Sequence, residues 1–269
     1  MFKLFKKISL LGLLAAALVA PTALAQSPVL DRVIDFKVLK VGMSGNQPPM
    51  NTNSRSGQLI GYEVDLARAL ASAMGARLEI VTMPFGELLA ALKDEKVDMV
   101  MSGMAITADR SRDVTFVGPY MMSGKSILTK SAMLSRATNS DEFNRADLKL
   151  AALDNSTSQT FVETAAPDAT LVKVKDYDEG VDAVIKDEVD ALVADMPICV
   201  LSVMRYPNAG LVTLKSPLSI EPFGIAVSKD DPAFANLVDN YLDTYGKMGV
   251  LAKLRKKWFE DKSWVAALP

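Results

Sequence analysis

The chain has 269 residues, in which 30 Lys and Arg face 32 Asp and Glu, and it contains one cysteine and no histidine. At about 150 residues per domain, this length predicts one or two domains. The missing histidine excludes Ser-His-Asp and Cys-His catalysis and His-ligated metal sites, and the single cysteine excludes internal disulfides and thiolate clusters. The near-balanced charge gives no electrostatic reason to bind nucleic acid. We therefore expect no metal, no cofactor and no nucleic-acid partner.

The first segment, residues 1–25, has the pattern of a secretory signal peptide. Three lysines among the first seven residues precede an uncharged apolar run at 8–20, and the small residues Ala23 and Ala25 follow. The apolar run is short for a transmembrane helix, which needs about 20 residues. We expect cleavage after Ala25 and export of the mature chain.

A strand–helix–strand pattern then occurs twice. The first copy has strands at 78–81 and 99–101 around a helix at 85–92, and the second has strands at 171–174 and 191–193 around a helix at 180–185. In both copies a Lys-Asp-Glu run that ends in Val-Asp precedes the last strand. Such units place their strands parallel, joined by right-handed crossovers.

Each copy follows a further strand and helix of similar pattern. The strands are at 38–43 and 148–153, and the helices are at 62–74 and 160–165. We therefore predict an α/β fold with two Rossmann-like lobes. The alternative is that an ordinary α/β chain produces this echo by chance.

The C-terminal region adds one strand and two helices. An apolar run at 223–227 predicts a strand that joins one of the lobes. Apolar residues from Phe234 to Tyr245 recur at helical spacing, and Gly246 and Gly249 interrupt the pattern before a second helix that includes Trp258. These aromatic residues are expected in the core.

Ligands of open α/β sheets bind beyond the carboxyl ends of the parallel strands. The residues that follow the predicted strands are Ser44, Gln47, Phe85, Gly103, Ala105 and Arg110 in the first lobe, and Thr157, Ser158 and Asp195 in the second. A guanidinium such as that of Arg110 binds a carboxylate through two N–H groups, and a helix start near Ser158 favours an anion. Asp195 can accept an ammonium group, so a cleft between the lobes would suit a small zwitterion.

Both charged residues also have an ordinary structural interpretation. Arg110 could form a surface salt bridge with Asp109 or Asp113, and Asp195 could be the N-cap of a helix that begins at Met196-Pro197. The sequence pattern leaves these alternatives open.

A set of motifs resembles bacterial solute-binding protein family 3, the extracytoplasmic receptors of polar amino-acid ABC importers. The matching residues are Gly61-Tyr62-Glu63-Val64-Asp65-Leu66, Val97-Asp98, Gly103-Met104-Ala105-Ile106-Thr107, Arg110, Phe116 and Pro119-Tyr120. The resemblance covers about residues 38–259. It implies a type II periplasmic-binding-protein fold, with lobe 1 at 26–121 plus 222–269, lobe 2 at 122–221, and a ligand cleft between them. It also implies a periplasmic location, a two-segment hinge, a membrane permease as partner, and a monomer.

The resemblance also implies roles for individual residues. Arg110 matches the family's clamp for the ligand carboxylate, and Asp195 matches the acid that binds the ammonium group. Thr157 and Ser158 match second-lobe donors to the carboxylate, Phe85 matches the aromatic that packs on the ligand, and Gly103 matches a backbone acceptor. Two positions depart from the family pattern: Ala105 replaces a common threonine or serine, and Gln47 replaces a common aromatic. These departures leave the identity of the ligand open.

Two other functions use the same scaffold. Periplasmic dehydratases of the cyclohexadienyl type share the segments Leu30-Asp31-Arg32-Val33 and Ser123-Gly124-Lys125, but Ile198 stands where those enzymes carry their proton-donating acid. An isoleucine cannot transfer a proton, so we expect no enzyme activity. A ligand-sensing subunit of a signalling system is the remaining alternative, and it would need a separate signalling partner.

Overall fold

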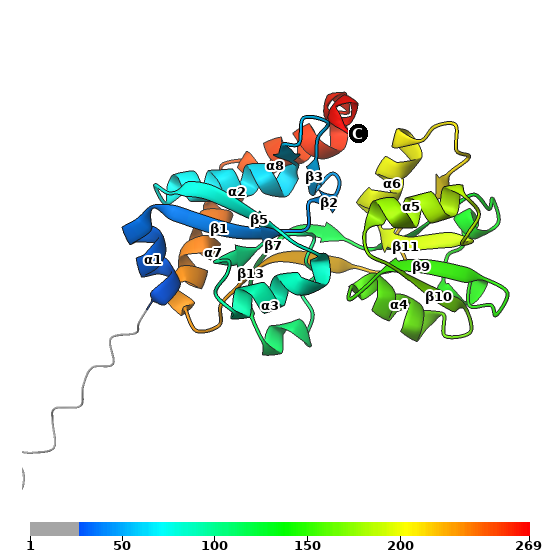
Figure 1. The fold of residues 1–269 in the computed structure, drawn as a ribbon, viewed down its shortest axis with the longest axis horizontal. Helices are drawn as coiled ribbons and strands as arrows, with labels where there is room; N and C mark the ends of the chain where they lie inside the picture. Colours follow the sequence, from blue (N-terminus) through cyan, green and yellow to red (C-terminus); the bar gives the residue numbers. More distant parts are fainter. Residues whose placement is uncertain (1–26) are drawn as a thin grey trace, which may run out of the picture.

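The computed structural model describes residues 27–269, so the predicted signal peptide lies outside the described residues. Figure 1 shows two α/β lobes side by side, each built around its own sheet. Both sheets have five strands. The predicted two-lobed α/β fold is confirmed.

The first sheet has the strand order β5-β1-β6-β13-β7. Its strands are β1 (Val38–Met43), β5 (Arg77–Thr82), β6 (Met99–Val100), β7 (Thr115–Ser123) and β13 (Glu221–Val227). Strand β1 pairs in parallel with β5 and β6, as the crossover pattern predicts, whereas β13 runs antiparallel to β6 and β7. The late strand β13 therefore returns the chain to the first lobe.

Helices cover both faces of this sheet. They are α1 (Pro28–Phe36), α2 (Tyr62–Ala73), α3 (Leu88–Lys93), α7 (Pro232–Lys247) and α8 (Val250–Arg255). A small sheet of β2 (Asn46–Gln47), β3 (Asn51–Asn53) and β4 (Leu59–Ile60) follows β1. In Figure 1, α2 lies on one side of β1 and β5, and α3 lies on the other.

Asp231 joins two helices of the first lobe. It is fully buried, and its carboxylate accepts the backbone N–H groups of Val29 and Leu30 in α1 and of Phe234 in α7. The first N–H groups of a helix have no partner within the helix. One side chain thus caps α1 and α7 together.

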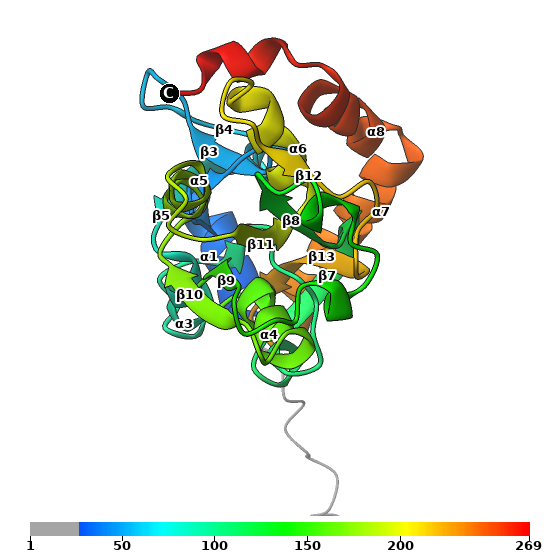
Figure 2. The same ribbon diagram turned by 90° about the vertical axis from the view of Figure 1, so that its right-hand side faces the viewer.

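The second sheet has the order β10-β9-β11-β8-β12. Its strands are β8 (Lys125–Thr129), β9 (Lys149–Leu153), β10 (Thr170–Val174), β11 (Ala191–Asp195) and β12 (Val212–Thr213), and its helices are α4 (Thr157–Ala165), α5 (Tyr177–Ile185) and α6 (Met196–Arg205). Strand β9 is parallel to β10 and β11, whereas β8 is antiparallel to β11. Figures 1 and 2 both show α4 on one side of this sheet and α5 and α6 on the other.

The apolar interior continues from one lobe into the other. One cluster of buried side chains includes Phe85 and Leu88 near α3 in the first lobe, and Leu153, Tyr177 and Leu192 in the second. The lobes are therefore in contact.

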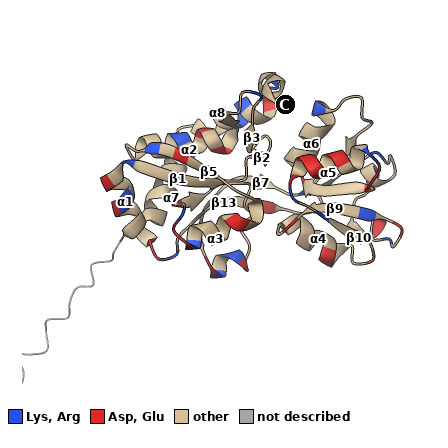
Figure 3. Ribbon diagram, in the orientation of Figure 1, with Lys and Arg blue, Asp and Glu red and all other residues tan. Residues whose placement is uncertain are grey.

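Charged residues of both signs are spread over the helices and loops of both lobes (Figure 3). Within residues 27–269, no helix combines the length and apolar character needed to cross a bilayer.

Candidate ligand-binding site between the two sheets

The loops at the carboxyl ends of the parallel strands meet between the lobes. Gly86 and Asn155 come from different lobes, and a Cβ atom built on Gly86 would lie 2.9 Å from the Asn155 side-chain nitrogen. Beside them, β2, which contains Gln47, contacts α5, which begins at Tyr177. The approach is close enough to shield side chains at this edge from bulk water.

A buried lysine lies between two carboxylates at this junction. Lys125 is 1% exposed, and its Nζ lies 3.0 Å from Asp195 Oδ1 and 3.0 Å from Glu221 Oε2. The register of β11 and β8 places Asp195 directly opposite Lys125. Since a buried charge is costly unless it is paired, the three side chains form one interdependent group.

Glu221 was not predicted from the sequence. It begins β13, the strand by which the chain returns to the first lobe. Its Oε2 accepts a hydrogen bond from the Thr157 hydroxyl at 2.8 Å as well as from Lys125. From the sequence, we expected only that the chain crosses between the lobes near this position. The crossing segment also places a charged side chain in the site.

Arg110 reaches the same region from the first lobe. Its Nη1 donates to the Ala105 carbonyl at 3.0 Å, and its guanidinium carbon lies 5.6 Å from the centre of the Phe85 ring. Burial lowers the pKa of the guanidinium, while the negative charges of Glu221 and Asp195 act in the opposite direction. Both carboxylates are thus close enough to influence Arg110.

The alternative interpretation of Arg110, a surface salt bridge with Asp109 or Asp113, is wrong for the residues that the structure describes. Asp109 pairs with Arg112, and Asp113 pairs with Lys93. Arg110 itself forms no ion pair with any described residue. A half-buried guanidinium without a carboxylate partner can bind an anion.

Asp195 does occupy the N-cap position of α6, but its carboxylate makes no capping hydrogen bond. The side chain turns toward Lys125 instead. Burial raises the pKa of the Asp195 carboxyl, and the neighbouring Lys125 ammonium counters this effect. The position fits the alternative interpretation, whereas the contacts of the carboxylate do not.

The start of α4 offers fewer free donors than its sequence indicates. Ser156 is the N-cap, and its hydroxyl already accepts the N–H groups of Ser158 and Gln159. Thr157 donates its hydroxyl to Glu221. The Ser158 hydroxyl is buried and makes no hydrogen bond with a described residue, so it is available to a ligand or a water molecule.

Hydrogen bonds tie together the first-lobe loops that carry the remaining predicted residues. Gln47 Oε1 accepts from the hydroxyls of Ser44 at 3.1 Å and Ser102 at 2.6 Å. Glu63 accepts from the Gly103 N–H at 2.7 Å and from Asn51 Nδ2 at 2.6 Å. These bonds fix the two loops relative to each other.

Glu63 is fully buried at the base of this network, and the Tyr120 hydroxyl also donates to it. Burial raises the pKa of its carboxyl, and the hydrogen bonds it accepts counter this effect. Gly103 adopts a φ of 54°, in the left-handed region that glycine tolerates best. The backbone at Gly103 therefore depends both on glycine and on the buried carboxylate.

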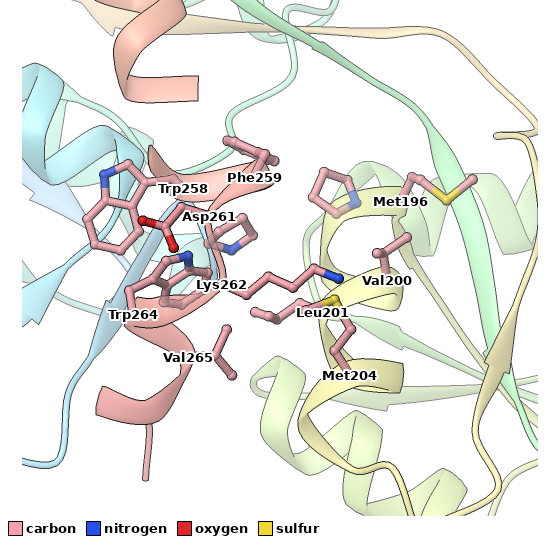
Figure 4. A pocket seen from close by; sticks show the side chains of 12 residues that line it. Met196, Val200, Leu201, Met204, Trp258, Phe259, Asp261, Lys262, Trp264 and Val265 are labelled. Carbon is pink, nitrogen blue, oxygen red and sulfur yellow. The ribbon is translucent and has the colours of Figure 1, made fainter. Parts of the chain in front are cut away.

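A hollow lined from both lobes lies apart from these residues and has a different character. It measures about 220 Å³ and lies between α6 and the C-terminal segment after α8, which comprises a π-helical turn (Lys256–Glu260) and a 3₁₀ turn (Ser263–Ala267). Figure 4 shows apolar side chains on both sides, with Lys262 reaching toward α6. None of the predicted site residues lines this hollow.

Two α/β lobes that bring charged side chains together at their junction define the type II periplasmic-binding-protein class. The family model for bacterial extracellular solute-binding proteins, family 3, matches residues 39–261. The chain belongs to this family.

Several relatives are similar over nearly their full length. A cyclohexadienyl dehydratase of Pseudomonas aeruginosa is 25% identical, over 98% of this chain and 96% of the relative. An L-cystine-binding protein of Escherichia coli is 26% identical, over 93% of this chain and 94% of the relative. The family similarity thus includes both binding proteins and an enzyme.

Solved structures agree with this assignment. An ancestral amino acid-binding protein, described as a precursor of cyclohexadienyl dehydratase, has a TM-score of 0.79 and 32% identity, covering 86% of this chain and 99% of that chain. A binding component of an ABC transporter from Wolinella succinogenes, complexed with lysine, has a TM-score of 0.80 and 30% identity, with the same coverage.

Proposed function

We propose that this chain is an extracytoplasmic solute-binding protein that captures a small amino acid or related carboxylate and delivers it to an ABC-type permease. The observation that carries this proposal is the Arg110 guanidinium, which lies over the Phe85 ring beside the point where Gly86 of one lobe approaches Asn155 of the other. The half-buried guanidinium has no carboxylate partner among the described residues, and a ligand carboxylate would supply one.

Each predicted site residue has a role in this proposal. Arg110 binds the ligand carboxylate through its N–H fork. Asp195 accepts the ligand ammonium through Oδ2, which has no hydrogen-bond partner in the described part of the chain. The other contacts to the ligand come from Phe85 by packing and from Thr157, Ser158, Gly103, Ala105, Gln47 and Ser44 at the rim and base of the site.

The proposed domains are residues 26–121 plus 222–269 for the first lobe and 122–221 for the second. The sheet membership of the chain changes between β7 and β8, and again between β12 and β13. Two crossing segments allow one lobe to rotate on the other as a hinge. Ligand binding would stabilise the closed arrangement, and we propose that this form docks on the permease in the periplasm.

The test is a thermal-shift screen of the purified mature protein. The panel contains the twenty amino acids, polyamines, opines and dicarboxylates. The proposal predicts that at least one amino acid or related carboxylate raises the melting temperature in proportion to the logarithm of its concentration, because it binds only the folded state. If only ligands without a carboxylate stabilise the protein, the proposal is wrong.

The second candidate is a dehydratase of the cyclohexadienyl type. It is favoured by the two carboxylates, Asp195 and Glu221, which flank Lys125 in the site. Against it, Ile198 is buried in the first turn of α6 and cannot supply a proton. Incubation of the protein with prephenate or arogenate distinguishes the two functions, since only an enzyme forms product faster than the spontaneous reaction in a control without protein.

A further inference from the structure

Lys125 lies in the site but has no role in the proposed function. Its side chain is 1% exposed, and its ammonium group lies at 3.0 Å from one oxygen of each flanking carboxylate. The antiparallel pairing of β8 with β11 fixes it opposite Asp195. A lysine is rarely buried unless it is paired, so this position indicates a specific electrostatic role.

The charges of the site can be counted. Asp195 and Glu221 together carry two negative charges, and Lys125 carries one positive charge, which leaves this group one positive charge short. Arg110 lies apart with one positive charge and no anionic partner among the described residues. These four side chains together therefore carry zero net charge, with one carboxylate in excess around Lys125 and an unpaired guanidinium at Arg110.

We propose that Lys125 is a specificity-determining residue that restricts the site to ligands of zero net charge, namely zwitterionic amino acids with an uncharged side chain. This inference rests on the proposed function and names its substrate class. The ligand carboxylate satisfies Arg110, and the ligand ammonium completes the pairing of Asp195 and Glu221. A ligand with one further charge would leave that charge unpaired in a shielded site, which is costly.

The nearby acidic side chains are already engaged by donors within the protein. Glu63 accepts hydrogen bonds from Asn51, Gly103 and Tyr120. Asp154 pairs with Lys173 at 3.1 Å, and Asp176 caps α5 by accepting the Glu179 N–H. Among the residues that the structure describes near the junction, the Lys125 group therefore sets the charge balance.

The test compares three ligands of similar length and different charge by isothermal titration calorimetry: glutamine, arginine and glutamate. For the unchanged protein we expect glutamine to bind at least about tenfold more tightly than either charged ligand. Lys125→Met removes one positive charge with little change in shape. This variant should lower the ratio of the dissociation constant for arginine to that for glutamine by at least about tenfold.

Lys130→Met is the matched control. Lys130 follows the other end of the same strand and pairs with Asp187 at 2.6 Å, away from the site. Lys130→Met removes the same charge and should leave the ratio of the arginine and glutamine dissociation constants unchanged. An equal shift in both variants would mean that overall charge, and not the position of Lys125, sets the preference.

Glu221→Gln provides a second variant, because Lys125→Met leaves two buried carboxylates together and can destabilise the fold. Glu221→Gln leaves the site with one excess positive charge, so it should shift preference in the opposite direction, toward glutamate, by about tenfold. The charge rule is overturned if the unchanged protein binds arginine or glutamate more tightly than glutamine. It is also overturned if Glu221→Gln leaves the ratio of the dissociation constants for glutamate and glutamine unchanged. If the panel of the previous subsection yields no carboxylate ligand at all, the proposed function falls and this inference falls with it.

Discussion

The proposed binding of the ligand carboxylate depends on Arg110. It is half-buried, packs over Phe85, and is bonded to the protein through the Ala105 carbonyl. We predict that Arg110→Ala weakens ligand binding by about 10- to 100-fold, corresponding to the loss of a charge-assisted hydrogen bond of about 1.5–3 kcal/mol. Calorimetry measures the change.

Arg112→Ala is the control for this prediction. Arg112 lies two residues along the same 3₁₀ turn, its side chain is 81% exposed, and it pairs with Asp109 at 3.5 Å. It should retain the affinity of the unchanged protein. Equal affinities for the two variants would exclude the carboxylate clamp.

Asp195 gives the site a pH dependence. Burial raises the pKa of its carboxyl above the ordinary value of 3.8. On acidification the carboxylate therefore takes up a proton at a higher pH than an exposed aspartate would, and it loses its attraction for a ligand ammonium. We predict that the affinity for amino acids falls as the pH is lowered through the raised pKa of Asp195. Asp195→Asn should make the affinity less dependent on pH.

The same variant should discriminate between ligands. Asp195→Asn should weaken amino acids more than their deaminated analogues, because only the former present an ammonium group. Asp187→Asn, at an exposed aspartate paired with Lys130, should change neither property. An equal loss for both ligand classes would show that Asp195 does not contact the ammonium group.

Some site residues could be predicted from the sequence and others could not. Arg110 and Asp195 follow predicted strands of the two lobes, so a position for both at the junction between the lobes could be expected from the parallel topology. Lys125 and Glu221 lie 96 positions apart on strands with no repeated pattern. Their pairing depends on β8 and β13, which belong to different sheets and bring the two side chains together only in the folded chain.

The regular elements were predicted best where their hydrophobic pattern is long. The strand expected at 38–43 coincides with β1, and the tail stripe corresponds to α7. Helix α1 and the small sheet β2–β4 were not predicted, and α6 was expected only in the alternative interpretation of Asp195 as a helix N-cap. Strands of two or three residues carry too little periodicity to be recognised, and α1 is held by the distant carboxylate of Asp231.

Asp231 provides a prediction about the elements. Its carboxylate satisfies N–H groups of both α1 and α7, so Asp231→Ala leaves both helix starts uncapped. We expect a loss of about 1–3 kcal/mol in the free energy of unfolding, measured by urea denaturation. The neighbouring exposed Asp230→Ala is the matched control and should leave the stability unchanged. Similar midpoints for the two variants would contradict the shared cap.

At the scale of the whole molecule, one continuous apolar cluster joins the two lobes. If the proposed hinge is correct, the ligand-free protein samples open arrangements, and ligand binding shifts the population toward the closed one. We predict that the radius of gyration measured by small-angle X-ray scattering decreases on addition of the ligand found in the screen. Arg110→Ala should need a higher ligand concentration for the same change. A radius that stays constant at saturating ligand would contradict the hinge.

The most direct test of the central claim is a crystal structure of the mature protein with that ligand bound. We predict electron density between the two sheets, with the ligand carboxylate on the Arg110 guanidinium and its ammonium group on Asp195. Density located instead in the apolar hollow between α6 and the C-terminal segment, with the junction of Arg110 and Asp195 free of ligand, would contradict the account.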